Sequence, residues 1–274
     1  MTRPGLGLLP PDGRHDAAMS RLMKPMCAAT DAEIPDEVDP GEILTVNDQG
    51  PFNSCCGNAT DKALEWDRWL TTGKRENLSA RFSYCAARMI DGTNDGPDAG
   101  AQIEAGARGS SEIGFVTEAD LPYWDYQNGE GFDPEIHPDM LKLAQQNKAQ
   151  SIVRMRSMDE CFRFIGTNQG GIIYGIWWTQ ELQNYDGSFM IQQSFGSSVV
   201  GGHALCLPGY KTIDGEKCPE TWNSHSVRWG SKGRMVTRPN VLWKAIEAAP
   251  WGAYGISCGK SFTKKPFQGF HGVF

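Results

Sequence analysis

The chain has 274 residues, of which 39% are hydrophobic and 22% are charged, and its formal net charge is −7. This size and composition suit one packed globular unit or two lobes that share a core. The negative charge offers no basic stripe for a phosphate backbone, so nucleic acid is not an expected partner. No run approaches the roughly 20 apolar residues that a membrane span needs, so a membrane is not expected as a partner either.

Residues 1–33 are rich in Pro, Gly and Met and show no clear periodicity. This composition predicts an N-terminal extension that wraps or caps the body. The extension could act as a short peptide that occludes a site, or as a surface strap or assembly arm, and the second interpretation is favoured. Prolines and charges stand where a signal peptide needs an apolar core, so we expect no classical export and a cytoplasmic location.

The eight cysteines lie at irregular spacings without a C-x-x-C pair. A zinc ribbon is therefore not expected, and neither a metal nor a cofactor is predicted. Without an export signal, most of the thiols are expected to be reduced.

The first half of the chain is predicted to be helical. A helix should start at Cys55, with Asn53 or Ser54 as its cap and Gly73 just beyond its end. Its apolar face is formed by residues at helical spacing, namely Ala59, Ala63, Trp66 and Leu70. Further helices are predicted from about Ser79, from a cap at Asp98 to near Gly109, and over 141–147.

After about residue 148 the pattern changes to strands. Strands are predicted over 151–155, over 172–178, over 203–207 with a histidine at its entrance, and near 222, 235–236 and 254–257. Two helices interrupt them: one opens with the capping box Ser157-Met158-Asp159-Glu160, and the other spans 237–248. Helices followed by strands predict an α+β fold.

Four residues at characteristic positions supply the groups that thiol-based acyl transfer needs. Gln49 lies six residues before Cys55, and a Gly-Gly-His-Ala at 201–204 and a Trp-Asn-Ser at 222–224 follow in that order. Cys55 would be the nucleophile and His203 the base that ionises it. Asn223 would hold the imidazole in the correct tautomer, while the Gln49 side chain and the Cys55 backbone N–H would receive the oxyanion.

Neighbouring residues compete for two of these roles. Cys56 is adjacent to Cys55, but one residue along a helix turns a side chain by about 100°, so only one of the two can face a cleft. Counting from Gln49 favours Cys55 and predicts that Cys56 packs inward. The other histidines are His15, His137, His225 and His271, and the Gly-Gly-His-Ala-Leu context favours His203. At the start of a helix, the free N–H groups and the dipole should favour the Cys55 thiolate.

These motifs resemble those of papain-family (C1) cysteine peptidases. The likeness runs from about residue 34 to 257 and includes Gln49 to Cys56, Pro122-Tyr123, Gly209-Tyr210 and Asn223 to Gly230. It implies a two-lobed fold with a helical left lobe, a β-barrel-like right lobe and the active site between them. The implied divisions are an extension at 1–33, a strand crossing to the right lobe at 34–48, a left lobe at 49–148 and a right lobe at 149–274.

Three positions depart from the family pattern. Phe52 replaces a cysteine, so the disulfide usual there cannot form, and Cys56 stands where a tryptophan is usual. His225 replaces another tryptophan, which in the family shields the His–Asn hydrogen bond. We interpret His225 as a substitute for that shield, with electrostatic tuning of the base as the alternative. Trp229 could roof the oxyanion region or simply belong to the core.

The sequence thus predicts a thiol-dependent endopeptidase that hydrolyses peptide bonds through an acyl-enzyme, with a peptide or protein as substrate. An amidase or acyl-transferase would keep the same residues. A structural or binding component of a larger assembly, such as a virion, is the other alternative. The lead-in at 9–16 resembles bacterial and phage-type relatives, so we expect a member of that type, associated with the virion if the source is viral.

Overall fold

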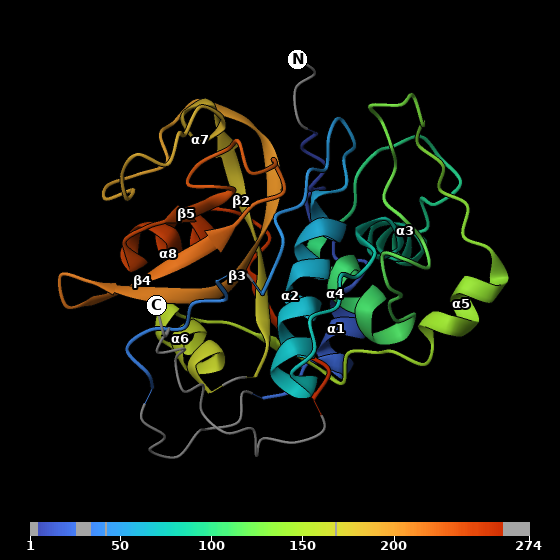
Figure 1. Ribbon diagram of the computed structural model, residues 1–274, viewed down its shortest axis with the longest axis horizontal. Coiled ribbons are helices and arrows are strands. Elements are labelled where there is room, and N and C mark those ends of the chain that lie inside the picture. Colours follow the sequence, from blue (N-terminus) through green and yellow to red (C-terminus); the bar gives the residue numbers. More distant parts are fainter. Residues whose placement is uncertain (1–4, 26–33, 42, 168, 260–274) are drawn as a thin grey trace.

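The computed structural model describes residues 5–25, 34–41, 43–167 and 169–259, which form a helical half and a sheet half side by side (Figure 1). The helical half contains α1 (Asp16–Leu22), α2 (Cys55–Thr72), α3 (Ala80–Asp91), α4 (Ile103–Glu112) and α5 (Pro138–Ala144). Among the described residues, every helix is too short or too polar to cross a bilayer.

The sheet half is built on six antiparallel strands in the order β1-β6-β2-β3-β4-β5. The strands are β1 (Ser151–Arg154), β2 (Gly171–Thr179), β3 (Val199–Ile213), β4 (Glu216–Trp222), β5 (Arg234–Val236) and β6 (Ala253–Ser257). Three helices accompany them: α6 (Met158–Gly166), α7 (Gln180–Gln183) and α8 (Pro239–Glu247). Helices before residue 148 and a sheet after it confirm the predicted α+β class.

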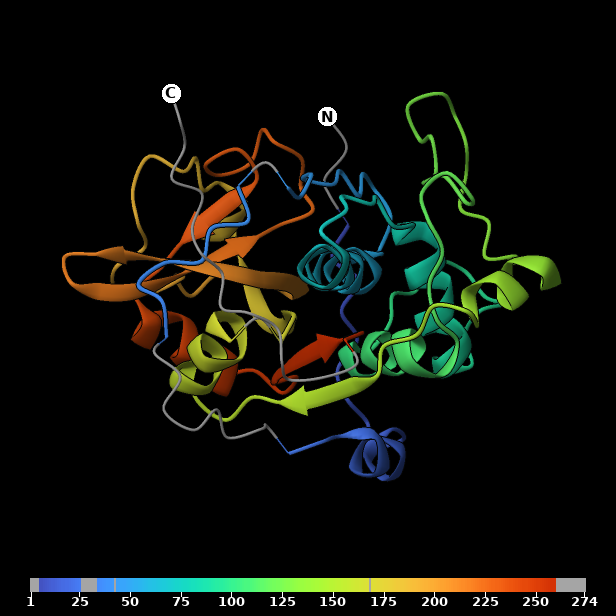
Figure 2. The same ribbon diagram turned by 60° about the horizontal axis from the view of Figure 1, so that its bottom comes forward.

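α2 is the central helix and lies between the two halves (Figures 1 and 2). All residues of its first part, Cys55 to Asp67, are buried. The sequence predicts one buried apolar face for this helix, whereas the structure buries it on all sides. Gly57 lets α3 approach closely, since a Cβ there would lie 2.5 Å from the backbone nitrogen of Tyr84. The helix ends at Gly73 in the left-handed conformation, as predicted.

The predicted caps have mixed outcomes, since Ser157 caps α6 as expected, whereas Ser54 precedes α2 without a capping hydrogen bond from its side chain. Ser79 caps α3, because its hydroxyl accepts a hydrogen bond of 3.0 Å from the Phe82 backbone N–H. The prediction that Asp98 caps the next helix is wrong, since Gln102 precedes α4. The Asp98 carboxylate instead accepts hydrogen bonds from the Asn53 backbone (2.8 Å) and the Tyr84 hydroxyl (2.5 Å), so its charge ties the start of α2 to α3.

Two element boundaries and one predicted strand differ from the predictions. β3 begins at Val199 rather than at His203, because the end of β2 pairs with Val199, Gly201 and Gly202. α5 begins at Pro138, which suits a first helical turn, with His137 as its cap. The crossing strand predicted over 34–48 is absent from the described part of that segment, which contacts the sheet half through isolated bridges from Val38 to Tyr210 and from Asp48 to His225. The domain boundaries at 33, 48 and 148 stay predictions.

Residues 5–9 of the N-terminal segment do not lie on the surface. In two views the segment runs between the helical half and the sheet half before it reaches α1 (Figures 1 and 2). Gly5, Gly7 and Leu8 are buried there. The favoured interpretation of this extension as a surface strap is therefore wrong for residues 5–9, and α1 was not foreseen at all.

Candidate active site

Cys55 is the first residue of α2 and is completely buried. Burial raises the pKa of its thiol to about 11, although the backbone groups of Ala204 and Gly7 lie close enough to lower it somewhat. Ala204 directly follows His203 on β3, so the sulfur lies on the side of α2 that packs against that strand. The expected lowering of the Cys55 pKa is not found in this arrangement. The loss of water around the buried sulfur raises the pKa more than the free N–H groups at the start of α2 lower it.

Cys56 faces the other way. Its sulfur lies 3.3 Å from the carbonyl of Gln102, next to the start of α4. Burial and the neighbouring Cys55 raise the pKa of Cys56 well above its ordinary value. Its position agrees with the prediction that Cys56 packs inward.

His203 and Asn223 are joined by a hydrogen bond. Nε2 of His203 lies 2.7 Å from Oδ1 of Asn223, which directly follows β4. The same oxygen accepts the Ser224 backbone N–H at 2.8 Å, so it is an acceptor and Nε2 of His203 is protonated. Nδ1 of His203 is left as the basic nitrogen and has no hydrogen-bond partner among the described residues. Burial lowers the pKa of His203 to about 4, against the opposing effect of Asn223.

The side chain of Gln49 is fixed at both ends of its amide. Its Oε1 accepts a hydrogen bond of 2.6 Å from the Ser224 hydroxyl. Its Nε2 donates to the carbonyl of Phe52 at 2.8 Å and to the carbonyl of Gly5 at 2.9 Å. The amide predicted to receive an oxyanion therefore already holds a peptide carbonyl.

That carbonyl belongs to a segment, residues 5–9, that contacts Gln49, Cys55 and, next to His203, Gly202. Its backbone bonds to both walls of the cleft: Gly5 N–H to Gly50 O (3.0 Å), Ala101 N–H to Gly7 O (2.9 Å), Leu9 N–H to Ala101 O (3.1 Å) and Leu8 N–H to Gly202 O (3.4 Å). The Trp251 indole also donates to Leu9 O at 2.7 Å.

Two glycines allow this close fit. A Cβ at Gly5 would lie 2.1 Å from the carbonyl oxygen of Phe52, and one at Gly7 would lie 1.9 Å from that of Asn53. The alternation of glycine at 5 and 7 was the signal in the sequence for a chain pressed against another backbone, and it was missed.

The other histidines differ in their surroundings, and one of them, His225, lies beside His203. His15 is buried against Asp91 and Arg108, at 2.7 Å from each. His137 is exposed and caps α5, and His271 lies outside the described residues. His225 does lie in the cleft, stacked on His203 with 4.6 Å between ring centroids and an angle of 37°. This contact agrees with the interpretation of His225 as an aromatic shield.

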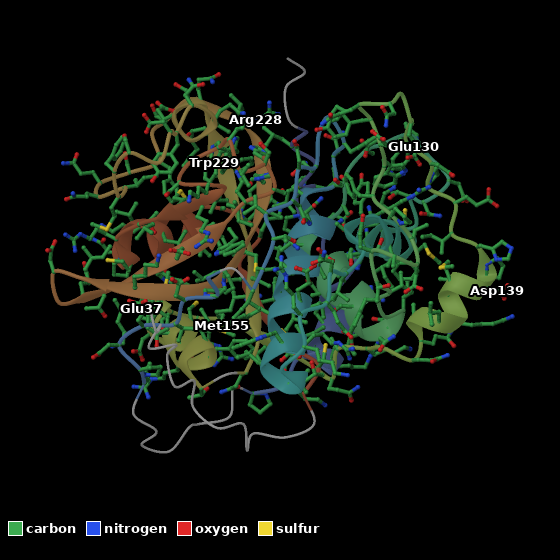
Figure 3. All side chains as sticks on the ribbon, in the orientation of Figure 1. Glu37, Glu130, Asp139, Met155, Arg228 and Trp229 are labelled. Carbon is green, nitrogen blue, oxygen red and sulfur yellow. The ribbon has the colours of Figure 1, made fainter. Side chains whose placement is uncertain are left out.

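Trp229 lies in the sheet half (Figure 3). It packs on Trp178 with 5.6 Å between ring centroids, and its indole donates to the carbonyl of Leu182 at 2.8 Å. Both contacts hold it in the core beneath β2 and α7, which supports the core role over that of a roof above the oxyanion.

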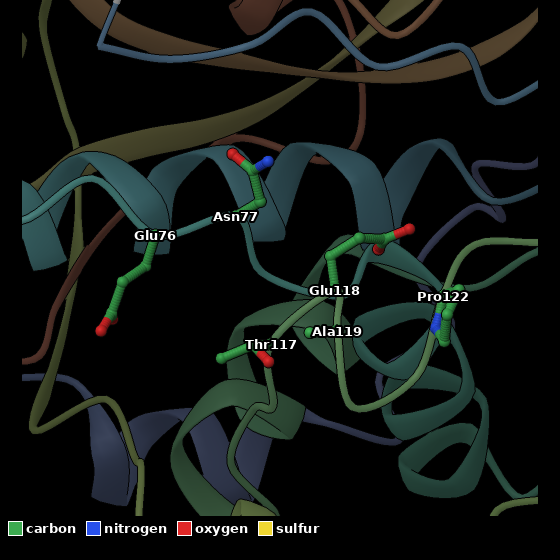
Figure 4. A pocket seen from close by; sticks show the side chains of 6 residues that line it. All are labelled: Glu76, Asn77, Thr117, Glu118, Ala119 and Pro122. Carbon is green, nitrogen blue, oxygen red and sulfur yellow. The ribbon is translucent and has the colours of Figure 1, made fainter.

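The described residues contain no group of three or more His, Cys, Asp or Glu side chains placed to hold a metal ion. An open depression of about 520 Å³ lies on the helical half, lined by Glu76, Asn77, Thr117, Glu118, Ala119 and Pro122 (Figure 4). None of the four candidate catalytic residues lines it, so it is separate from the cleft.

Comparison with known proteins identifies the class. Residues 34–249 match the family model described as "Papain family cysteine protease". Cysteine proteinase 1 of Entamoeba histolytica is 26% identical over 217 residues, covering 76% of this chain and 64% of that protein. "Probable cysteine protease RDL2" of Arabidopsis thaliana is 24% identical over 242 residues, covering 85% of this chain and 61% of that protein. The chain thus spans less than two thirds of each of these relatives.

A solved structure shares the fold. That of xylellain, a cysteine protease from Xylella fastidiosa, superposes with a TM-score of 0.73 at 21% identity, covering 94% of this chain and 98% of that one. The chain belongs to the papain family of cysteine proteases, because the family model matches most of its length. The predicted family and fold are confirmed, whereas the bacterial or phage type and the cellular location stay predictions.

Proposed function

We propose that the chain is a thiol-dependent endopeptidase that hydrolyses peptide bonds at Cys55. The observation that carries this proposal is the peptide already present in the cleft. Residues 5–9 lie over Cys55 with their backbone bonded to both walls and one carbonyl on the Gln49 amide. A cleft that binds main-chain groups in this way suits an extended polypeptide substrate.

The roles follow from the hydrogen bonds. The Cys55 thiol passes its proton to Nδ1 of His203, and the thiolate attacks the substrate carbonyl carbon. Asn223 keeps the proton on Nε2, so Nδ1 is the nitrogen that can act as base. Nε2 of Gln49 and the Cys55 N–H stabilise the tetrahedral oxyanion. The imidazolium then protonates the leaving amine, and water hydrolyses the thioester that remains on Cys55.

The arrangement with residues 5–9 in the cleft represents a latent form. Burial holds the pKa of Cys55 at about 11 and that of His203 at about 4, so the neutral pair is favoured at neutral pH. The sulfur contacts the Gly7 backbone, while Nδ1 of His203 lacks a partner in the described part of the chain. Substrate therefore enters when residues 5–9 leave the cleft, and water entering with it restores the ion pair.

A matched pair of cysteine variants tests the assignment. Cys55→Ala should abolish hydrolysis of an unfolded protein substrate, whereas Cys56→Ser should keep most of it, because the two sulfurs face opposite sides of α2. Circular dichroism of both variants checks that they fold. Full activity of the Cys55 variant would refute the proposal.

The same assay separates hydrolysis from the transferase and amidase alternatives. With a free amine acceptor present, an endopeptidase releases mainly free carboxyl ends, which mass spectrometry detects. Products that carry the acceptor at most cleaved ends would instead assign an acyl-transferase.

A further inference from the structure

His225 is a buried polar residue without an explanation in its protein surroundings. Its side chain is 5% exposed, and neither ring nitrogen has a hydrogen-bond partner among the described residues. Leaving a buried polar group unsatisfied is unfavourable, because it loses its hydrogen bonds to water without replacement. A residue that only shielded the His203–Asn223 bond would need no nitrogen, so the imidazole calls for a ligand that uses it.

The ring is held firmly by aromatic neighbours. It stacks on His203 at 4.6 Å and meets the edge of Trp178 at 5.3 Å and 84°. Its backbone is paired with Asp48, and the Gln49 N–H donates to the carbonyl of the preceding Ser224 at 2.8 Å. These backbone contacts hold the segments that carry His225 and Gln49 against each other.

One peptide carbonyl meets both side chains. The carbonyl of Gly5 accepts a hydrogen bond of 2.9 Å from Nε2 of Gln49. The same Gly5 backbone contacts the His225 ring, where it raises the pKa of the imidazole against the larger effects of burial and of His203. The contact falls short of a full hydrogen bond, as is common before a transition state forms. Gly5 thus lies where its carbonyl has Gln49 as donor and the His225 ring as a second neighbour.

His225 remains neutral there while His203 changes charge. Burial and the contact with His203 lower the pKa of His225 to about 2. Two stacked imidazoles cannot both be protonated at low cost, and His203 receives the proton of the thiol. His225 therefore keeps a single N–H and does not compete as the base. A neutral N–H donor aimed at a carbonyl oxygen is the requirement for an oxyanion donor.

We propose that His225 is a catalytic residue, a side-chain donor to the tetrahedral oxyanion beside Gln49 and the Cys55 N–H. This inference rests on the proposed function. It assigns a chemical role to a position where the resembling family has a shielding tryptophan.

The test compares His225→Phe with His225→Gln in the full chain. Phe keeps an aromatic ring against His203 and removes the donor, so kcat should fall on the order of 10² with KM little changed. Gln restores an N–H without an aromatic ring and should recover at least about tenfold of that loss. The alkylation rate of Cys55 by iodoacetamide, a reaction without an oxyanion, should stay within about twofold in both variants.

Two results would overturn the proposal. If His225→Phe turns over like the unaltered chain, the donor has no role. If Gln fails to improve on Phe, or alkylation slows as much as turnover does, His225 acts only by shielding or by supporting His203. Either outcome leaves Cys55→Ala as an independent test of the peptidase itself.

Discussion

Two segments are buried between the halves of the molecule, α2 and residues 5–9, and they are held by different forces. α2 has 18 residues that make their own helical hydrogen bonds, and its first part is buried. Residues 5–9 have no regular structure, and their hydrogen bonds go to the cleft: to Gly50, Ala101, Gly202, Gln49 and Trp251.

This difference indicates that α2 is part of the folded core, whereas residues 5–9 only occupy the cleft. The burial of α2 is part of the core, and losing it would unfold the protein. The partners of residues 5–9 are main-chain and side-chain groups that a substrate backbone could satisfy equally well. Such a segment can leave at a cost far below that of global unfolding. A peptidase cleft filled by its own chain is therefore compatible with a stable fold.

Truncation in α2 gives the largest expected effect. Leu64 is fully buried, so Leu64→Ala should lower the free energy of unfolding by about 2–5 kcal/mol. Urea denaturation measures the loss. Thr72→Ala, at the exposed end of the same helix, is the matched control and should change stability by less than about 0.5 kcal/mol. Equal losses in both variants would contradict the assignment of α2 to the core.

The polar interior of the cleft should make the protein sensitive to acid. The native pKa of His203 is about 4 against an ordinary 6.5, so the unfolded chain binds a proton first as the pH falls. The free energy of unfolding should be constant above about pH 6.5 and decrease between 6.5 and 4, with on the order of 3 kcal/mol from His203 and a similar loss from His225, whose pKa is lowered to about 2 by burial.

Urea titrations across this pH range check the slope. His203→Gln should remove about half of the slope, because His225 supplies the rest, whereas His137→Gln, at the exposed cap of α5, should leave it unchanged. An identical slope in both variants would mean that the buried imidazole is not its source.

A single methyl group added at Gly7 should displace residues 5–9 from the cleft. The Cβ of Gly7→Ala would lie 1.9 Å from the carbonyl oxygen of Asn53, so the segment should leave and the apparent activity should rise by about tenfold or more. The rise in activity is measured as the rate of peptide hydrolysis divided by the amount of Cys55 that can be alkylated. Pro10→Ala, at an exposed position just beyond the segment, should have no such effect. A drop in activity with Gly7→Ala would show that the segment helps rather than blocks.

Removing one bond to the segment should have the smallest effect. Trp251→Phe deletes the 2.7 Å hydrogen bond to the carbonyl of Leu9, worth about 1 kcal/mol. Hydrogen exchange at the Leu8 and Leu9 amides should quicken about fivefold, while the amide of Ile176 in β2 keeps its rate. Faster exchange at all three would indicate general loosening instead.

The same two segments show what could be predicted from the sequence. The helix at Cys55, the strand over 172–178 and the cap at Ser157 follow local rules of periodicity and capping, and the sequence predicts each of them. The chain order of Gln49, Cys55, His203 and Asn223 indicated the candidate site, and the His203–Asn223 bond is present.

Contacts between distant residues were not predictable in this way. The burial of residues 5–9 depends on partners such as Gly202, nearly two hundred positions away. Asp98 failed as a cap because Asn53 and Tyr84 compete for its carboxylate. The ionisation state of Cys55 also depends on burial by a remote segment, and a local rule for helix starts cannot include that.

The most direct measurement is the site and rate of alkylation by a thiol-reactive epoxide, followed by mass spectrometry alongside peptide hydrolysis. We expect label on Cys55 alone, faster labelling in Gly7→Ala than in the unaltered chain, and loss of hydrolysis in proportion to the label. Label mainly on Cys56 or Cys206, or hydrolysis that persists when Cys55 is fully modified, would contradict the account.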